Sequence, residues 1–454
     1  MTEDLTKRYK NYALYLPSLQ SGYADFVASN SDKDVREGNL PTGFSISDLN
    51  FLNPKSKLWT CGNVLYSGGQ YGTERIERRN IVAERNWTNT VVVGDSGGFQ
   101  LGTRAYKNKQ EKEHMDRFEF DPQAMFENWH SCGYKERTLT WLELYTDYAM
   151  TLDMVLWAEE NYAKSKNYTH ASQSHLRKLS IQQLIDLSVD NLRYFADNRG
   201  KIPGRSTKFL SVIQDIGVVN GVDTGMEWYK AVKDFDFEGW SLGSEAGNVP
   251  LNTLKWLRRL LDDGKLERTE WVHLLMKSPP RLSVIFTAIQ HAVSKAANRE
   301  IQLSYDSSSP HQTAGKNTSL NIIPELTSDL RTWTMSSERI KQSYDIATGK
   351  EQLTWEIETP LAKFFTPNDL VYKQGAYDDS RTDTLANNLL VNHNIYAFHR
   401  AAVDACDLAF HPQNKDYSRI PTEISDAIAC IEQYFVCDNP DVLHEQYAKA
   451  FDAI

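Results

Sequence analysis

The stretch VVVGDSGGFQ at residues 91–100 is an apolar, β-branched run that ends abruptly in an acid and a pair of glycines. Three consecutive valines are typical of a buried strand. Gly97 and Gly98 permit a sharp turn in which the backbone approaches a ligand closely. We therefore expect Asp95 to lie at the carboxyl end of a strand and to face a cleft.

Strands of this kind recur along the chain and alternate with helical patterns. Strands are expected at 90–95, 148–153, 208–214, 239–243, 272–276 and 301–306, with two weaker candidates within 59–67 and near 320–323. Apolar residues at helical spacing lie between several of them, most clearly at 282–296. Eight strands that alternate with helices favour an α/β fold of the (β/α)8 TIM-barrel type, although an open doubly wound sheet shares this alternation.

The pattern also changes along the chain in a way that predicts its domain organisation. The barrel is expected to span residues 1–359, with a polar and aromatic insertion at about 101–147. From residue 360 to 454 the signal is helical, at 387–410 and 422–435, which predicts a C-terminal helical region.

The composition is that of a globular protein: of 454 residues, 41% are hydrophobic and 24% are charged. The net charge of −10 argues against nonspecific wrapping of nucleic acid, but it allows a local basic surface on an acidic body. No apolar stretch of about 18 residues and no signal peptide is visible. Five scattered cysteines show no paired spacing: Cys61, Cys132, Cys406, Cys430 and Cys437. We therefore predict a cytoplasmic protein with reduced thiols and no membrane partner.

Four of the expected strands end in a carboxylate or an amide, at Asp95, Asp153, Gln214 and Asp306. In a barrel the carboxyl ends of the strands meet at one face, so these groups would share a site. They could bind a planar heterocycle with several N–H donors, or act as acid, base and nucleophile at an acetal-like carbon. A Mg²⁺ site and simple helix capping are the alternatives. The glutamine and the glycine turns suit a heterocycle better than Mg²⁺.

The segment DSGGFQ at 95–100 resembles the signature of the tRNA-guanine transglycosylase superfamily, whose members exchange guanine for a 7-deazaguanine base within a nucleic acid. Further blocks follow in the family's order: VIQ at 212–214, FEGWSLG at 237–243, HLLM at 273–276, and YD at 305–306 with Pro310 shortly after. The resemblance covers roughly residues 90–310, with a weaker echo at 393–394.

The resemblance implies a role for each matching residue. Asp306 corresponds to the nucleophile that attacks the anomeric carbon of the sugar and holds a covalent glycosyl-enzyme, and Asp95 corresponds to the acid/base residue. Asp153 and Gln214 would read the edge of guanine, since a carboxylate accepts from N–H groups and an amide donates to a carbonyl oxygen. The other residues implied in base binding are Ser96, Phe99, Gly243 and Met276, of which Phe99 and Met276 would sandwich the ring.

The chain also departs from the family's tRNA-directed members. Those members carry a zinc site of three cysteines and a histidine, and this chain matches only the histidine, as His393, so we expect no cofactor and no metal. His399 and Cys406 lie seven residues apart without a cysteine pair. The arginine-containing stretch after the nucleophile is replaced by SSSPHQT at 307–313, and Glu245 stands where the family has an apolar residue.

These departures resemble the DNA-directed branch, the DpdA-type enzymes of bacteria and phages, which insert 7-cyano-7-deazaguanine (preQ0) into DNA. We therefore expect an enzyme whose partners are DNA, guanine, free preQ0 and helper proteins of the modification system. The alternatives are a tRNA-guanine transglycosylase without zinc, a noncatalytic partner subunit, and a retaining glycosidase. Basic residues of the insertion or of the 75–85 stretch are expected to hold the nucleic acid: Arg104, Lys107, Lys109 and Lys112, or Arg75, Arg78, Arg79 and Arg85.

Overall fold

The structure is a computed structural model of the whole chain. The residues that it describes are 2–29, 40–71, 81–83, 85–106, 109–118, 121–275, 280–339, 354–370, 384–413 and 417–454.

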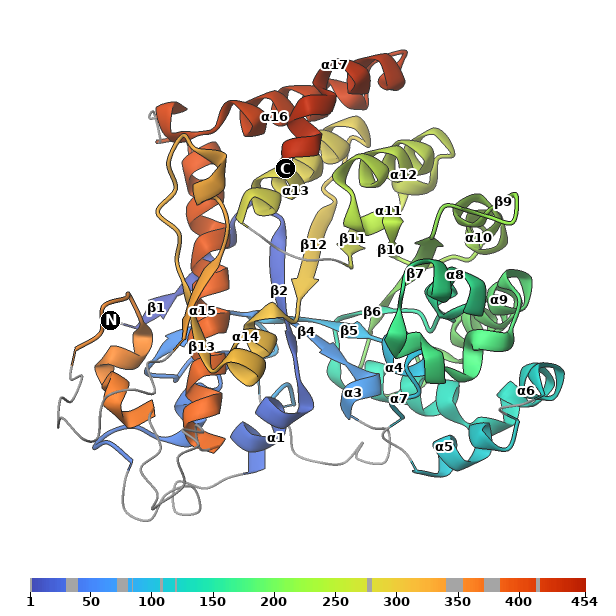
Figure 1. Cartoon of the computed structure of the whole chain (residues 1–454), viewed down its shortest axis with the longest axis horizontal. Coiled ribbons are helices and arrows are strands. Elements are labelled where there is room, and N and C mark those ends of the chain that lie inside the picture. The colour runs from blue at the N-terminus through green and yellow to red at the C-terminus, as the bar shows by residue number, and fades with distance from the viewer. Residues whose placement is uncertain are drawn as a thin grey trace.

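Eight parallel strands close into a barrel (Figure 1). In chain order they are β2 (Leu14–Leu19), β4 (Asn63–Ser67), β5 (Val91–Asp95), β6 (Tyr148–Met150), β7 (Lys208–Asp215), β10 (Gly239–Ser244), β11 (Trp271–Leu274) and β12 (Gln302–Ser307). The ring closes because β12 pairs with β2, so the first and last strands are neighbours. The fold is therefore a (β/α)8 TIM barrel, and the open-sheet alternative is excluded.

One expected barrel strand was wrong and one was missed. The segment near 320–323 forms β13 (Ser319–Ile322), which pairs antiparallel with β14 (Ser336–Arg339) outside the barrel. The eighth barrel strand is β2 instead, whose six residues are all buried. Its sequence LYLPSL contains Pro17, and a proline argues against a central strand because it cannot donate a ladder hydrogen bond. Pro17 is the fourth of the six residues of β2 and lies in register with Ser307, the last residue of β12.

Helices surround the barrel. Those that follow the first seven strands are α1 (Ser21–Ser29), α3 (Gly68–Tyr71), α4 (Gly98–Gly102), α5 (Lys109–Asp116), α6 (Pro122–Asn128), α7 (Tyr134–Tyr145), α8 (Glu160–Ser165), α9 (Ile181–Asn198), α10 (Thr224–Val232), α11 (Glu245–Asn248), α12 (Pro250–Asp262) and α13 (Pro280–Ala296). The expected insertion at 101–147 contains α5, α6 and α7, and α7 packs against β5. The end of the insertion is therefore part of the barrel wall.

The C-terminal helical region packs directly on the barrel. After α14 (Ser309–Asn317) come α15 (Thr384–Phe410), α16 (Thr422–Tyr434) and α17 (Pro440–Ala453). The long helix α15 contacts α13, α14 and β2, while α16 lies on α13 and α17 on α12. Most side chains of α15 are buried in the core shared with the strands. It therefore closes the helical ring between β12 and β2. No helix within the described ranges is both long and apolar enough to cross a membrane.

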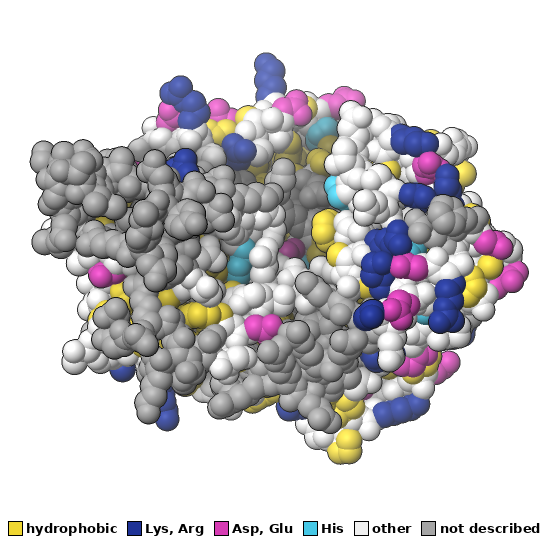
Figure 2. All heavy atoms as spheres, turned by 60° about the horizontal axis from the view of Figure 1, so that its bottom comes forward, with side chains coloured by type: hydrophobic (Ala, Val, Ile, Leu, Met, Phe, Trp, Pro, Cys, Tyr) yellow, Lys and Arg dark blue, Asp and Glu magenta, His cyan; other side chains and the backbone are white. Residues whose placement is uncertain are grey.

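The carboxyl ends of the strands open onto a hollowed face. The helices α1, α3 and α14, which directly follow β2, β4 and β12, lie in the lower half of Figure 1. Figure 2 brings this side forward and shows a hollow near its centre, with an acidic side chain visible inside it. Lys and Arg side chains gather to the right of the hollow, on the side where α4, α5 and α8 lie in Figure 1.

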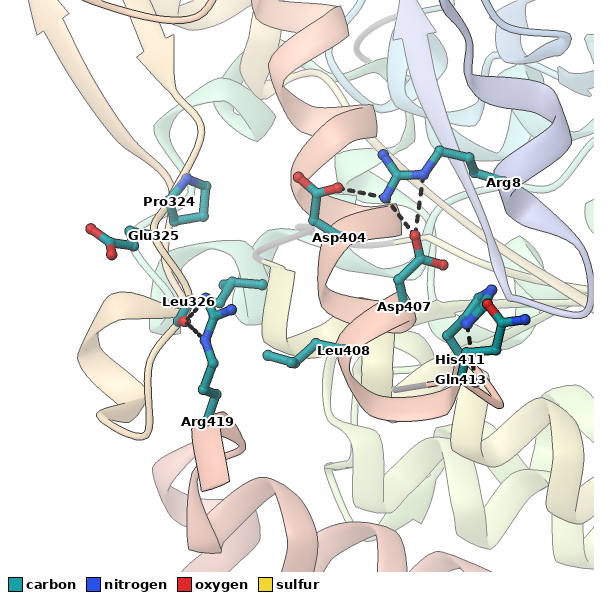
Figure 3. A pocket seen from close by; sticks show the side chains of 10 residues that line it. All are labelled: Arg8, Pro324, Glu325, Leu326, Asp404, Asp407, Leu408, His411, Gln413 and Arg419. Atoms are coloured by element: carbon teal, nitrogen blue, oxygen red, sulfur yellow. Dashed lines mark hydrogen bonds and ion pairs between the residues drawn. The ribbon is translucent and has the colours of Figure 1, made fainter. Parts of the chain in front are cut away.

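A second cavity of about 550 Å³ lies near the amino end of β2, between the N-terminal segment and the last turns of α15 (Figure 3). The charged and titratable side chains that line it are Arg8, Glu325, Asp404, Asp407, His411 and Arg419. Arg8 bridges two carboxylates of α15, at 2.6 Å from Asp404 and 2.5 Å from Asp407. Tyr12 donates to the other oxygen of Asp407 at 2.9 Å. These ion pairs hold α15 to the segment that leads into β2.

The first prediction concerns this anchor. Arg8→Leu should lower the free energy of unfolding by about 1–3 kcal/mol, because it leaves two partly buried carboxylates of α15 without their shared cation. Urea denaturation followed by tryptophan fluorescence measures the change. Arg331→Leu is the control, since Arg331 pairs with Asp329 on the surface and its side chain is 91% exposed. An unchanged midpoint for Arg8→Leu would show that the bridge does not hold α15.

Candidate functional site at the barrel mouth

Asp95 lies at the end of β5, and a tight glycine turn fixes its position. One carboxylate oxygen of Asp95 accepts a hydrogen bond from the Gly97 N–H at 3.2 Å. Gly97 has φ 93°, in the left-handed region that favours glycine. A Cβ on Gly97 would lie 2.7 Å from the Cα of Gly69, so the loops after β4 and β5 touch through their backbones. The first glycine of the pair that marks this segment in the sequence is therefore needed by the turn itself.

Asp153 and Gln214 form a buried pair beside this turn. The side-chain oxygen of Gln214 accepts from the Leu156 N–H at 2.9 Å, so the amide nitrogen of Gln214 points toward Asp153 and donates to its carboxylate. Asp153 lies three residues beyond the end of β6, which is shorter than expected. The other oxygen of Asp153 would lie 2.9 Å from a Cβ on Gly98, so this glycine lets the carboxylate approach the backbone.

Asp306 lies on β12 with its side chain 17% exposed, and it has a histidine beside it. The Nε2 atom of His273, on the neighbouring strand β11, is 3.5 Å from Oδ1 of Asp306. His273 belongs to the HLLM block at 273–276, in which the family resemblance implies a role only for Met276. Its place in register with Ser304, two residues before Asp306, could have indicated this contact, because residues two apart share one face of a strand.

The pKa values of Asp95 and Asp153 are both raised. Desolvation by the surrounding protein raises the pKa of Asp95, and the negative charge of Asp306 raises it further. Hydrogen bonds from the Ser67 hydroxyl and the Gly97 N–H oppose this rise. Burial raises the pKa of Asp153 to about 7. The charge of Asp95 adds to this rise, and the hydrogen bond from Gln214 opposes it. The structure thus brings four of the expected site residues together at one mouth.

The other expected base-binding residues are placed less directly. The Ser96 hydroxyl is buried and donates to the Thr151 carbonyl at 3.1 Å, which ties the loop after β5 to the end of β6. Gly243 lies on β10 in register with Gln214. Phe99 is 55% exposed, and its ring packs near Trp157 and His170. Met276 lies outside the described residues.

The expected nucleic-acid-binding residues are partly engaged in ion pairs. Arg104 and Lys112 both pair with Asp116 at 2.7 Å, and Lys109 lies 3.5 Å from Glu113. Arg85 is buried and binds both carboxylate oxygens of Asp147, at 2.6 and 3.1 Å, so it stabilises the barrel wall. Lys107, Arg75, Arg78 and Arg79 lie outside the described residues.

The residues around His393 do not fit a zinc site. Its Nδ1 lies 2.9 Å from the Thr359 hydroxyl and its Nε2 lies 2.9 Å from the Asn321 carbonyl, so both ring nitrogens are engaged in holding α15 to neighbouring segments. His399 shares a hydrogen bond with Tyr9 at 2.8 Å. Across the described residues, no group of three or more His, Cys, Asp or Glu side chains could hold a metal ion.

Comparison with models of known protein families finds none that matches this chain, and a search of curated proteins gives no match either.

A prediction follows from the raised pKa of Asp153. Its pKa is about 7 in the folded chain and near 4 in an unfolded one, so folding favours the protonated form. The contribution of Asp153 to stability is therefore full below pH 4 and is lost as the pH rises through 7. Relative to the wild type, Asp153→Asn should gain stability between pH 5 and 7, by at most about 1.4 kcal/mol for each pH unit, and then level off.

Urea denaturation at several pH values measures this difference. Asp262→Asn serves as the control, because Asp262 pairs with Arg258 on the surface and its side chain is 52% exposed. A difference between Asp153→Asn and the wild type that stays constant across this pH range would contradict the raised pKa.

Proposed function

We propose that this chain is a DNA guanine transglycosylase, which replaces guanine in DNA with the 7-deazaguanine base preQ0 through a covalent intermediate on Asp306. The observation that supports this most directly is the convergence of three carboxyl groups and one amide at the mouth: Asp95, Asp153, Asp306 and Gln214. Two of them suit the recognition of a purine edge, and two suit the chemistry of a glycosidic bond.

The pair of Asp153 and Gln214 complements guanine. An ionised Asp153 can accept from the N1–H and the exocyclic amine of guanine, and the amide nitrogen of Gln214 can donate to the O6 carbonyl. The Gln214 amide carries two N–H groups, so it can donate to the base while it also donates to Asp153. The Leu156 N–H holds the amide in the orientation that this requires. A 7-deazaguanine presents the same edge, so one pocket serves both bases.

The reaction needs only the two remaining carboxyl groups. An oxygen of Asp306 attacks C1′ of the sugar, the bond from C1′ to N9 breaks, and the departing guanine takes a proton from Asp95. The raised pKa of Asp95 favours the protonated form that this step uses. The incoming base then returns its N9 proton to Asp95 and attacks C1′, which releases Asp306. Two displacements retain the configuration at C1′.

DNA is the proposed substrate because features that would serve tRNA are missing from the sequence. The segment that follows Asp306 has no arginine, and the surroundings of His393 do not suit zinc. A guanine within a duplex must be flipped out to reach the mouth, at a cost of a few kcal/mol, and helper proteins that open the duplex would reduce that cost. We place this reaction in the cytoplasm, where DNA and the free bases are available to it.

Asp306→Asn should abolish base exchange while the protein stays folded, because an amide is a far weaker nucleophile than a carboxylate. Incorporation of radiolabelled guanine into a single-stranded oligonucleotide measures the exchange, and thermal unfolding monitors the fold. Asp262→Asn is the matched control and should exchange guanine at the wild-type rate. Exchange by Asp306→Asn at an undiminished rate would show that another group attacks the sugar.

A further prediction separates DNA from tRNA. Radiolabelled guanine or preQ0 should enter DNA and not tRNA, and the rate should fall as salt rises, because phosphate contacts by Lys and Arg weaken as counterions compete. Charge reversal at Lys109, on the exposed side of α5, should slow labelling of DNA if this surface holds the strand. Efficient labelling of tRNA with none in DNA would overturn the substrate while leaving the Asp306 chemistry in place.

A further inference from the structure

Four polar side chains form a ladder inside the barrel, which leads from its interior to the mouth. Trp271 and His273 lie two residues apart on β11, and Ser304 and Asp306 lie two residues apart on β12. The two strands pair with His273 opposite Ser304. Because side chains two apart share one face of a strand, all four point to the same side of this pair.

One hydrogen bond of this ladder has a fixed direction. The indole N–H of Trp271 can only donate, and it donates to the Ser304 hydroxyl oxygen at 2.7 Å. The Ser304 hydroxyl lies 2.8 Å from Nδ1 of His273. When Ser304 donates its own proton to Nδ1, the ring proton of His273 is carried on Nε2.

The charge of Asp306 selects the same arrangement. Nε2 of His273 is buried, makes no hydrogen bond within the described residues, and faces Oδ1 of Asp306 at 3.5 Å. An N–H at this position is attracted to the carboxylate, whereas a lone pair would be repelled by it. A contact of 3.5 Å is longer than a hydrogen bond, as is common for catalytic groups in the absence of substrate, and it leaves the other oxygen of Asp306 available.

We propose that Trp271 and Ser304 fix the tautomer of His273 so that its Nε2–H faces Asp306, orients this carboxylate and assists its release from the sugar. His273 is a positioning residue in this scheme. Its effect on the reaction rests on the proposed glycosyl transfer, whereas the tautomer does not.

The effect on the reaction follows from the charges of the two states. A donor at Oδ1 stabilises the free carboxylate more than the neutral ester of the covalent intermediate. When the incoming N9 attacks C1′, the bond from C1′ to the Asp306 oxygen breaks and its electron pair returns to the carboxylate, while the N9 proton passes to Asp95. The Nε2–H of His273 therefore aids this second step, and its loss should let the intermediate accumulate.

The tautomer can be measured without any activity. In the protein labelled with ¹⁵N-histidine, the His273 signals, assigned by their absence from His273→Gln, should report a proton on Nε2 and a bare Nδ1. Ser304→Ala should weaken this preference and leave only the part that the charge of Asp306 supplies. Ser241→Ala is the matched control, because Ser241 is a buried serine on β10 in register with His273 and should leave the signals unchanged. A proton on Nδ1 in the wild type would overturn the proposal, whatever the reaction proves to be.

Enzyme kinetics test whether the Nε2–H of His273 aids the release of Asp306 from the sugar. His273→Asn, which has no group that reaches Asp306, should lower kcat for guanine exchange by about tenfold with little change in KM, and should raise the fraction of enzyme trapped as a denaturant-resistant adduct. His273→Gln can place an amide N–H near the position of Nε2 and should recover most of kcat. Equal losses in the two variants, with no increase in adduct, would overturn the positioning role. A wild-type enzyme that exchanges no base at all would overturn the proposed function, while the tautomer would still be decided by NMR.

Discussion

The proposed chemistry of this protein depends on the desolvation of carboxyl groups that a closed barrel holds close together. Parallel strands bring their carboxyl ends to one face, and Asp95, Asp153 and Asp306 all lie there. Water is largely kept from these groups, so the charge on one raises the free-energy cost of a charge on the next. Desolvation is the largest cause of the raised pKa values of Asp95 and Asp153, and the charge of a neighbouring carboxylate adds to it. In the proposed reaction, similar side chains can therefore take different roles, since a carboxyl group that keeps its proton can act as an acid beside one that attacks.

Uncharged neighbours reduce the cost of ionising these carboxyl groups without cancelling it. The Gly97 N–H and the Gln214 amide donate to Asp95 and Asp153 and partly offset the cost of ionisation. Each donor is itself held in place, by the left-handed turn at Gly97 and by the Leu156 N–H behind Gln214. No cation in an ion pair with Asp95 or Asp153 is found in the described part of the chain. Such a cation would lower the pKa values and remove the difference between acid and nucleophile.

The strands that end in polar residues could be predicted from the sequence because they are apolar runs that stop at a carboxylate or an amide. The first barrel strand could not, since Pro17 interrupts its pattern. The place of α15 in the helical ring could not be predicted either, because more than sixty residues separate it from α14 and only tertiary packing places it beside β2. The pairing of Arg104 and Lys112 with Asp116 depends on side-chain geometry that spacing alone does not provide. His273 was within a quoted motif, yet its contact with Asp306 required the register of β11 and β12.

The account is tested most directly by identifying the residue that becomes linked to the sugar. The protein would be incubated with a single-stranded DNA oligonucleotide that contains one guanine, denatured, and digested with protease and nuclease. Tandem mass spectrometry of the peptides should find a deoxyribosyl group on Asp306. Attachment at Asp95 or Asp153, or a peptide that contains Asp306 unmodified while guanine is released, would contradict the mechanism.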